Sequence, residues 1–239
     1  NLDDLLSDVA ISGADVGLAF DGDGDRVVVV TNNTKVIASD KLLMLFAKEL
    51  LATQPGADIL FDVKCSRDLV TVITTNGGRP VMTKTGHSFL KQGLEDTGGL
   101  LAGEMSGHFY FKDRWGGFDD GLYAAARFLE ILANNDCSSD ELFAQFPERC
   151  STSEIQIPID DSQKISLIQT VVNQNKDMPN ANISTVDGLR IEFSYGWGIV
   201  RASNTGSYLV ARFEANSEGE LQQVKSTFKD LLQKADPMM

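Results

Sequence analysis

Two kinds of hydrophobic pattern alternate along the chain as far as residue 147. Short apolar runs, which are typical of buried strands, occur at residues 16–20, 27–30, 59–63, 80–83 and 99–102. Apolar residues at helical spacing occur at 2–11, 39–52, 66–75, 88–94 and 119–132, and a capping-box spacing at Ser138 and Glu141 predicts one more short helix. Strands and helices in this alternation predict a layered α/β domain with a mostly parallel sheet.

The segment 39–52 has a strong helical pattern. Its predicted core-facing residues are Leu42, Leu43, Phe46, Leu50 and Leu51. A serine directly before such a run is typical of an N-cap, so we expect Ser39 to cap the helix.

The pattern changes after residues 147–153, which we interpret as a domain boundary. Strand-like segments follow at 155–159, 189–195, 198–202 and 208–214, and helix-like segments at 163–173 and 220–232. Closely spaced strands joined by short turns and flanked by helices predict an antiparallel sheet. The expected fold class is therefore a mixed α/β layered domain followed by a smaller α+β domain with an antiparallel sheet.

Composition and charge narrow the classes of partner. The chain has 239 residues, of which 42% are hydrophobic and 23% charged, as in globular proteins. Its formal net charge of −13 predicts that neither nucleic acid nor an anionic membrane surface is a partner. Three cysteines without paired spacing favour the reducing cytoplasm. The chain begins with Asn1 rather than with Met and has no signal-like segment. We therefore expect it to begin inside a longer protein.

The loop between the first two predicted strands contains three aspartates that alternate with glycines: Asp21, Asp23 and Asp25. Close carboxylates repel one another unless a cation lies among them, and oxygen ligands suit Mg²⁺. Arg26 follows directly and indicates an anionic partner such as a phosphoryl group. The alternatives are an acidic surface turn and a calcium EF-hand. The EF-hand requires glycine and glutamate where Arg26 and Asn32 stand, so that alternative fails.

Polar residues gather at three further places in this part of the chain. Lys64 follows the strand predicted at 59–63, at the end where α/β sheets place ligands. Both histidines of the chain lie in glycine-flanked polar loops. One of these loops contains Gly86 and His87 before a predicted helix, where backbone N–H groups favour an anion. The other contains Glu104, Met105, Ser106, Gly107 and His108, which suit the hydroxyls of a sugar. A surface lysine and structural histidines are the alternatives.

A second candidate anion site lies near the C-terminus. Arg201 ends a predicted strand, and the loop after it holds Ser203, Asn204 and Thr205. The guanidinium offers a bidentate fork for phosphate, and Arg212 on the next strand is placed to reach the same anion. The alternative is a polar hairpin turn.

Taken together and in this order, these motifs resemble the α-D-phosphohexomutase family, and most of all its phosphomannomutase/phosphoglucomutase members. The resemblance implies a metal loop at 21–26, a sugar-recognition loop at 104–108 and a phosphate loop at 201–205. It implies that residues 1–35 end domain 2, that 36–149 form domain 3, and that 150–239 form domain 4. The family's phosphoserine loop has no counterpart here, and Gly206 and Ser207 depart from the usual exit of the phosphate loop.

The resemblance also implies a function. It is interconversion of hexose 1-phosphate and hexose 6-phosphate, with mannose or glucose as the sugar, through a phosphoserine and a bisphosphorylated intermediate. Mg²⁺ on the aspartates, with Arg26, Lys64 and His87 as catalytic groups, would serve the transfer. The partners would be a phosphorylated hexose and the missing N-terminal domains, without which this chain is expected to be inactive. A phosphoglucosamine mutase and a non-catalytic phosphosugar- or metal-binding module remain the alternatives.

Overall fold

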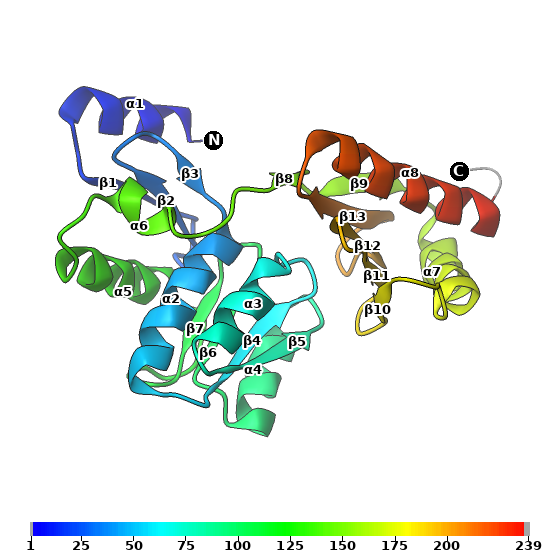
Figure 1. The fold of residues 1–239 in the computed structure, drawn as a ribbon, viewed down its shortest axis with the longest axis horizontal. Coiled ribbons are helices and arrows are strands. Elements are labelled where there is room, and N and C mark those ends of the chain that lie inside the picture. The colour runs from blue at the N-terminus through cyan, green and yellow to red at the C-terminus, as the bar shows by residue number, and fades with distance from the viewer. Residues whose placement is uncertain (1, 237–239) are drawn as a thin grey trace. The chain divides into compact units, whose positions relative to one another are not determined.

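The structure is a computed structural model that describes residues 2–236. The chain divides into two compact units, unit 1 up to Pro147 and unit 2 from Glu148 (Figure 1). Within the described residues, no helix has both the length and the apolar character needed to cross a membrane.

Unit 1 begins with a helix and a small antiparallel sheet and continues as an alternation of helices and strands (Figure 1). Its elements are α1 (Asp3–Ser12), β1 (Val16–Phe20), β2 (Val27–Thr31), β3 (Val36–Ile37), α2 (Ser39–Thr53), β4 (Asp58–Asp62), α3 (Asp68–Thr75), β5 (Arg79–Thr83), α4 (His87–Thr97), β6 (Leu101–Gly103), β7 (Phe109–Phe111), α5 (Gly121–Ala133) and α6 (Ser139–Phe143). The small sheet has the order β1-β2-β3, and the larger one has the order β5-β4-β6-β7. Strand β4 runs parallel to β5 and β6, whereas β7 is antiparallel to β6.

The larger sheet of unit 1 is covered on both faces, because side chains of a strand alternate between them. On β4, Ile59 and Phe61 belong to the core that contains α2. Leu60, between them, packs with Leu90 and Leu94 of α4 on the other face. This gives the helix–sheet–helix layering that buried, mostly parallel strands require.

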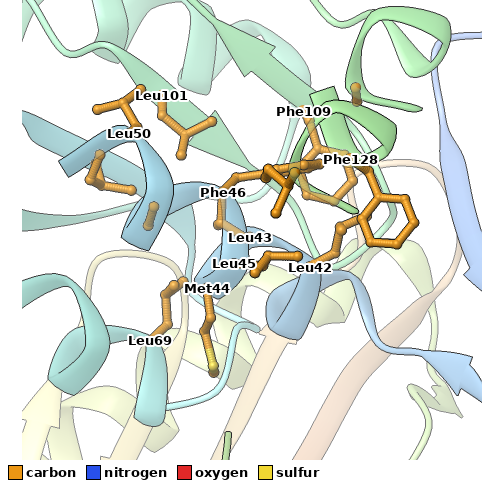
Figure 2. Packing of buried hydrophobic residues seen from close by; sticks show 14 of the residues in the cluster. Leu42, Leu43, Met44, Leu45, Phe46, Leu50, Leu69, Leu101, Phe109 and Phe128 are labelled. Atoms are coloured by element: carbon orange, nitrogen blue, oxygen red, sulfur yellow. The ribbon is translucent and has the colours of Figure 1, made fainter. Parts of the chain in front are cut away.

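Phe46 of α2 lies at the centre of the larger core (Figure 2). Its ring meets Phe109 and Phe111 of β7 edge-on, with ring centroids 5.2 and 5.0 Å apart. Edge-to-face contacts of this kind add to the stabilisation from burial. Helix α2 is therefore fixed against the strand that follows the predicted sugar-recognition loop.

Unit 2 is a single antiparallel sheet with two helices on one face. Its elements are β8 (Cys150–Ser151), β9 (Ile155–Pro158), α7 (Asp161–Asn175), β10 (Asn182–Ser184), β11 (Leu189–Glu192), β12 (Gly196–Ala202), β13 (Tyr208–Ala215) and α8 (Glu218–Ala235). The strand order is β10-β11-β12-β13-β8, and β9 also pairs with β13. Apolar side chains of β11, β12 and β13 pack with α7 and α8. The predicted fold class is confirmed for both parts of the chain.

Helix starts were predicted less well than helix existence. The prediction that Ser39 caps α2 is wrong, because the extended Ala38 holds the N-cap position and no side chain caps the helix. Helix α3 starts at Asp68 rather than at Ser66, whose N–H donates to Asp40 Oδ2 at 2.9 Å. Helix α5 starts after Asp120, whose side chain accepts from the Tyr123 N–H. Ser66, before α3, thus contacts a distant segment, and Asp120, before α5, forms a hydrogen bond within its own turn.

The core position of Phe46 yields the first prediction. Phe46→Ala should lower the free energy of unfolding of unit 1 by about 3–5 kcal/mol, since it removes a ring that is 1% exposed and leaves a cavity. Denaturant unfolding followed by circular dichroism measures this. The matched control is Phe89→Ala on α4, whose side chain is 45% exposed and should cost less than about 1 kcal/mol. Equal losses for the two variants would contradict the assignment of Phe46 to the core.

Candidate functional site

The aspartate loop connects β1 to β2, which pair as an antiparallel hairpin. One carboxylate oxygen each of Asp21, Asp23 and Asp25 lie within 4.8 Å of one another, so the loop does bring the three side chains together. Asp25 Oδ1 is buried and has no hydrogen-bond partner among the described residues. A buried acceptor of this kind calls for a partner, and a hard divalent cation bound by oxygens fits it.

Arg26 holds the first aspartate of the loop. Its Nε lies 2.6 Å from Asp21 Oδ2, and its backbone N–H donates to Asp21 Oδ1 at 3.2 Å. Partial desolvation opposes ionisation of Asp21, but the hydrogen bonds and charge of Arg26 hold its pKa far below the usual value. Asp21 is therefore a charged ligand candidate over the whole physiological pH range.

The first residue of helix α5 contacts the aspartate loop. The Gly121 N–H donates to the Gly24 carbonyl at 3.0 Å. A Cβ at position 121 would lie 2.5 Å from the Arg26 carbonyl oxygen, so only glycine permits this approach. The loop thus depends on a residue about a hundred positions away in the sequence.

The candidate sugar loop connects β6 to β7 and adjoins the metal loop directly. The Val27 N–H donates to the Gly107 carbonyl at 3.2 Å, and Gly107 has a φ of 100°, which favours glycine. His108 Nε2 lies 3.3 Å from Asp25 Oδ2. Its Nδ1 lies 2.8 Å from the Ser106 hydroxyl. Metal loop and sugar loop therefore form one block of polar groups.

Glu104 of the candidate sugar loop is buried, with 4% exposure. Its Oε2 accepts from the Ser106 hydroxyl at 3.2 Å, and its Oε1 accepts from the Tyr110 hydroxyl at 3.1 Å. Burial raises the pKa of Glu104, and the negative charge of Asp62 raises it further. Nearby His108 and the two hydroxyls lower it only in part. The carboxylate is held in one orientation, as a hydrogen-bond acceptor for a ligand must be.

Lys64 and His87 follow adjacent strands. Lys64 is 5% exposed, which rules out a surface lysine, and its Nζ lies 3.7 Å from Asp62 Oδ2. His87 is the first residue of α4, one position earlier than predicted, and is exposed. Gly86 before it has a φ of 131°, a backbone conformation that favours glycine.

The predicted phosphate loop connects β12 to β13 in unit 2. Arg201 is 4% exposed, and its guanidinium donates to Asp187 Oδ2 at 2.8 Å and to Asn204 Oδ1 at 3.0 Å. The Ser203 hydroxyl accepts from the backbone N–H groups of Thr205 and Gly206. The loop is therefore an ordered turn around a fixed guanidinium rather than an open hairpin.

Arg212 lies on the same face of the sheet as Arg201. Ile199, two residues before Arg201, pairs with Arg212 on β13, and paired residues of neighbouring strands share a face. The Arg212 guanidinium lies 5.4 Å from the Trp197 ring centroid and 3.9 Å from Glu214 Oε2. It is thus held by cation–π and ion-pair contacts.

The structure also identifies polar residues that the sequence did not single out. Asp62 lies at the end of β4 beside Lys64. Asp119 binds Lys91 at 2.6 Å and lies within hydrogen-bond reach of Tyr110, at 3.5 Å. One oxygen of Asp119 also lies within 4.8 Å of ligand atoms of Asp25 and His108. A carboxylate directly after the apolar run 59–61 is a usable sequence signal for Asp62, whereas the place of Asp119 depends on the fold.

Two family models together match most of the chain. Residues 38–150 match the model for phosphoglucomutase/phosphomannomutase, alpha/beta/alpha domain III. Residues 154–231 match the model for the phosphoglucomutase/phosphomannomutase C-terminal domain.

Individual relatives agree with this match. The chain is 53% identical over 237 residues to a phosphomannomutase/phosphoglucomutase of Pseudomonas putida, and 45% identical over 234 residues to a phosphoglucomutase of Neisseria gonorrhoeae. These alignments cover 99% and 98% of this chain but 51% of each relative, so the chain spans about half the length of the curated relatives it matches.

Solved structures share the fold. A phosphoglucomutase/phosphomannomutase family protein of Burkholderia thailandensis superposes with a TM-score of 0.92 at 45% identity, over 99% of this chain and 50% of that one. An N-acetylphosphoglucosamine mutase of Aspergillus fumigatus, solved in complex with GlcNAc-6P and magnesium, has a TM-score of 0.65 at 14% identity, over 91% of this chain and 48% of that one. The second likeness shows the fold alone.

The raised pKa of Glu104 yields a prediction for pH dependence. A carboxyl group whose pKa is higher in the folded state costs stability once pH rises above its unfolded pKa, here near 4.5. Glu104→Gln removes this cost. Relative to the wild type, the variant should gain stability as pH rises above about 4.5 and on towards 7, in denaturant unfolding measured across that range.

Glu130→Gln is the control with the opposite sign. The hydrogen bond from Arg114 lowers the pKa of Glu130 below 4.5, so its contribution is full above that pH and disappears as pH falls below it. In measurements extended below pH 4.5, the deficit of Glu130→Gln should therefore shrink on acidification. A Glu104→Gln difference that stays constant across the range would contradict the raised pKa.

Proposed function

Because the chain belongs to the phosphoglucomutase/phosphomannomutase family, we propose that it forms the C-terminal part of a phosphohexomutase that interconverts hexose 1-phosphate and hexose 6-phosphate of glucose or mannose. The relatives with 53% and 45% identity support this. Residues 1–35 would complete domain 2, with 36–149 as domain 3 and 150–239 as domain 4. The three cysteines, none of which forms a disulfide among the described residues, support a cytoplasmic location.

The observation that carries the proposal is the direct link between the metal loop and the sugar loop. His108 lies 3.3 Å from Asp25 and, through Ser106, reaches the carboxylate of Glu104. A metal site that shares hydrogen bonds with acceptors for hydroxyls suits a substrate with both a phosphoryl group and a sugar ring. A site that binds only a metal ion, or only a sugar, does not require this link.

Asp21, Asp23 and Asp25 would hold a Mg²⁺ ion. The buried Asp25 Oδ1, which has no hydrogen-bond partner among the described residues, supports this. When bound, the ion would neutralise charge on the phosphoryl group in transit between a phosphoserine elsewhere in the polypeptide and a sugar hydroxyl. Arg26, beside the site, would bind the same group.

The other candidate residues would take distinct roles. Lys64 and His87 would lie at the reacting hydroxyl as electrostatic or proton-transfer groups. Glu104, Ser106 and His108 would bind sugar hydroxyls, with the backbone of Met105 and Gly107 shaping the loop. At the carboxyl ends of neighbouring parallel strands, these groups occupy the usual ligand edge of an α/β sheet.

The phosphate that does not react would bind in unit 2. Arg201, Ser203, Asn204, Thr205 and Arg212 would form its site. Support comes from the burial of Arg201 and its fixed guanidinium, which is preorganised for a charge-assisted bond.

The proposal predicts metal-dependent mutase activity. The full-length polypeptide should convert glucose 1-phosphate or mannose 1-phosphate to the 6-phosphate, and chelation of Mg²⁺ should abolish the conversion. Asp23→Asn should raise the Mg²⁺ concentration for half-maximal activity about tenfold or more. Asp8→Asn on the exposed side of α1 is the control and should change nothing. Conversion of glucosamine phosphate alone would favour the phosphoglucosamine mutase alternative, and no conversion would favour a binding module.

The phosphate site of unit 2 can be tested at Arg201. In the full-length protein, Arg201→Gln should weaken binding of a hexose phosphate roughly 10- to 100-fold, because a charge-assisted hydrogen bond to phosphate is lost. Calorimetric titration at fixed salt measures the dissociation constant. Arg149→Gln, also in unit 2 and bonded to Asn216, controls for the loss of one positive charge. Equal binding by Arg201→Gln and the wild type would rule out this phosphate site.

A further inference from the structure

Asp62 is a fully buried carboxylate at the carboxyl end of β4. Its Oδ1 accepts from the backbone N–H groups of Lys64 and Met105, at 3.3 and 3.4 Å, and from the Cys65 thiol at 3.2 Å. Its Oδ2 accepts from the Thr85 hydroxyl at 3.1 Å and lies 3.7 Å from Lys64 Nζ. One side chain thus meets four hydrogen-bond donors and one ammonium group.

These partners belong to three different loops. Lys64 and Cys65 follow β4, Thr85 follows β5, and Met105 follows β6. The three strands are parallel neighbours, so their carboxyl ends lie at one edge of the sheet. Each of the three loops also contains a residue of the candidate site.

We propose that Asp62 is a positioning residue that fixes these three loops relative to one another and holds the Lys64 ammonium group at the site. The inference rests on the proposed function. Asp62 has no exposed surface and both its oxygens are engaged, so it acts through Lys64, through the loop of His87 and through the sugar loop rather than by touching a ligand.

Only a carboxylate satisfies this set of donors. Aspartate presents acceptors on both oxygens, whereas asparagine replaces one of them by an N–H₂ group. That group would face either the Thr85 hydroxyl and the Lys64 ammonium, or the three donors at Oδ1. Either placement sets the N–H₂ group against other buried donors or against a buried ammonium group, which is costly, so the loops would move apart.

The negative charge of Asp62 also affects Glu104 in the sugar loop. Burial raises the pKa of Glu104 most, and the negative charge of Asp62 raises it further. The buried charge therefore links the lysine and the sugar-binding carboxylate electrostatically as well as through the backbone of Met105.

The strand itself supplies a matched control. Asp58, at the amino end of β4, is also buried and forms an ion pair with Arg79. Asp58→Asn removes the same charge from the same strand at the opposite end. In the full-length protein, Asp62→Asn should lower kcat/KM for hexose phosphate about 100-fold, the loss expected when reacting groups shift by about 1 Å, while Asp58→Asn should stay within about twofold of the wild type.

Hydrogen exchange of the same proteins separates positioning from a general loss of stability. In Asp62→Asn, peptides covering residues 83–90 and 102–110 should exchange about tenfold faster than in Asp58→Asn, while α2 stays protected. Equal kinetics or equal exchange for the two variants would overturn the proposal. Inactivity of the wild type would refute the proposed function instead, and the exchange comparison would still decide on Asp62.

A second variant covers the case in which Asp62→Asn does not fold. Thr85→Val keeps the carboxylate and removes one donor without changing side-chain volume. Exchange should then accelerate in residues 83–90 and remain unchanged in 102–110. Unchanged exchange in both segments would show that the Thr85 bond does not fix its loop and would also overturn the proposal.

Discussion

The repulsion among three aspartates in one short loop is the constraint on which the site of unit 1 depends. Their oxygens lie within 4.8 Å of one another, and such a cluster is stable only when positive charge and hydrogen-bond donors surround it. Arg26 binds Asp21, and His108 approaches Asp25. Arg26 Nε also lies 3.8 Å from Asp25 Oδ1, but this oxygen has no hydrogen-bond partner among the described residues, which suits a site for a cation.

The parallel strands of the larger sheet bring together loops that are distant from one another in the sequence. Parallel strands end at the same edge, so the loops after β4, β5 and β6 meet there without any long connection. The antiparallel β7 then returns the chain beneath the sugar loop, where Tyr110 reaches Glu104. Phe109 and Phe111, on the opposite face of β7, pack against Phe46 and so couple the site to the core.

The sequence was sufficient to predict the long elements and the two kinds of sheet, because their hydrophobic periods are strong. Some strands of two or three residues, such as β3 and β7, are too short to carry a period and were not predicted, whereas the three-residue β6 was predicted as part of the apolar run 99–102. The same distinction holds for the site. Motifs such as the aspartate loop are local in sequence, and their members do come together. Gly121, Asp119 and the contacts of Asp62 arise from packing between distant segments, which no local pattern encodes.

The two candidate anion sites differ in what each requires before a phosphate can bind. In unit 1, the carboxylates repel a phosphate until a cation has joined them, and the net charge of −13 adds to that barrier. In unit 2, Arg201 carries a permanent positive charge that is already oriented by Asp187 and Asn204. If the proposed function holds, recognition of the unreactive phosphate in unit 2 is independent of metal, while binding of the phosphoryl group in transit depends on it. Under that function, the chemistry of the side chains would separate the groups that hold the substrate from those that react with it.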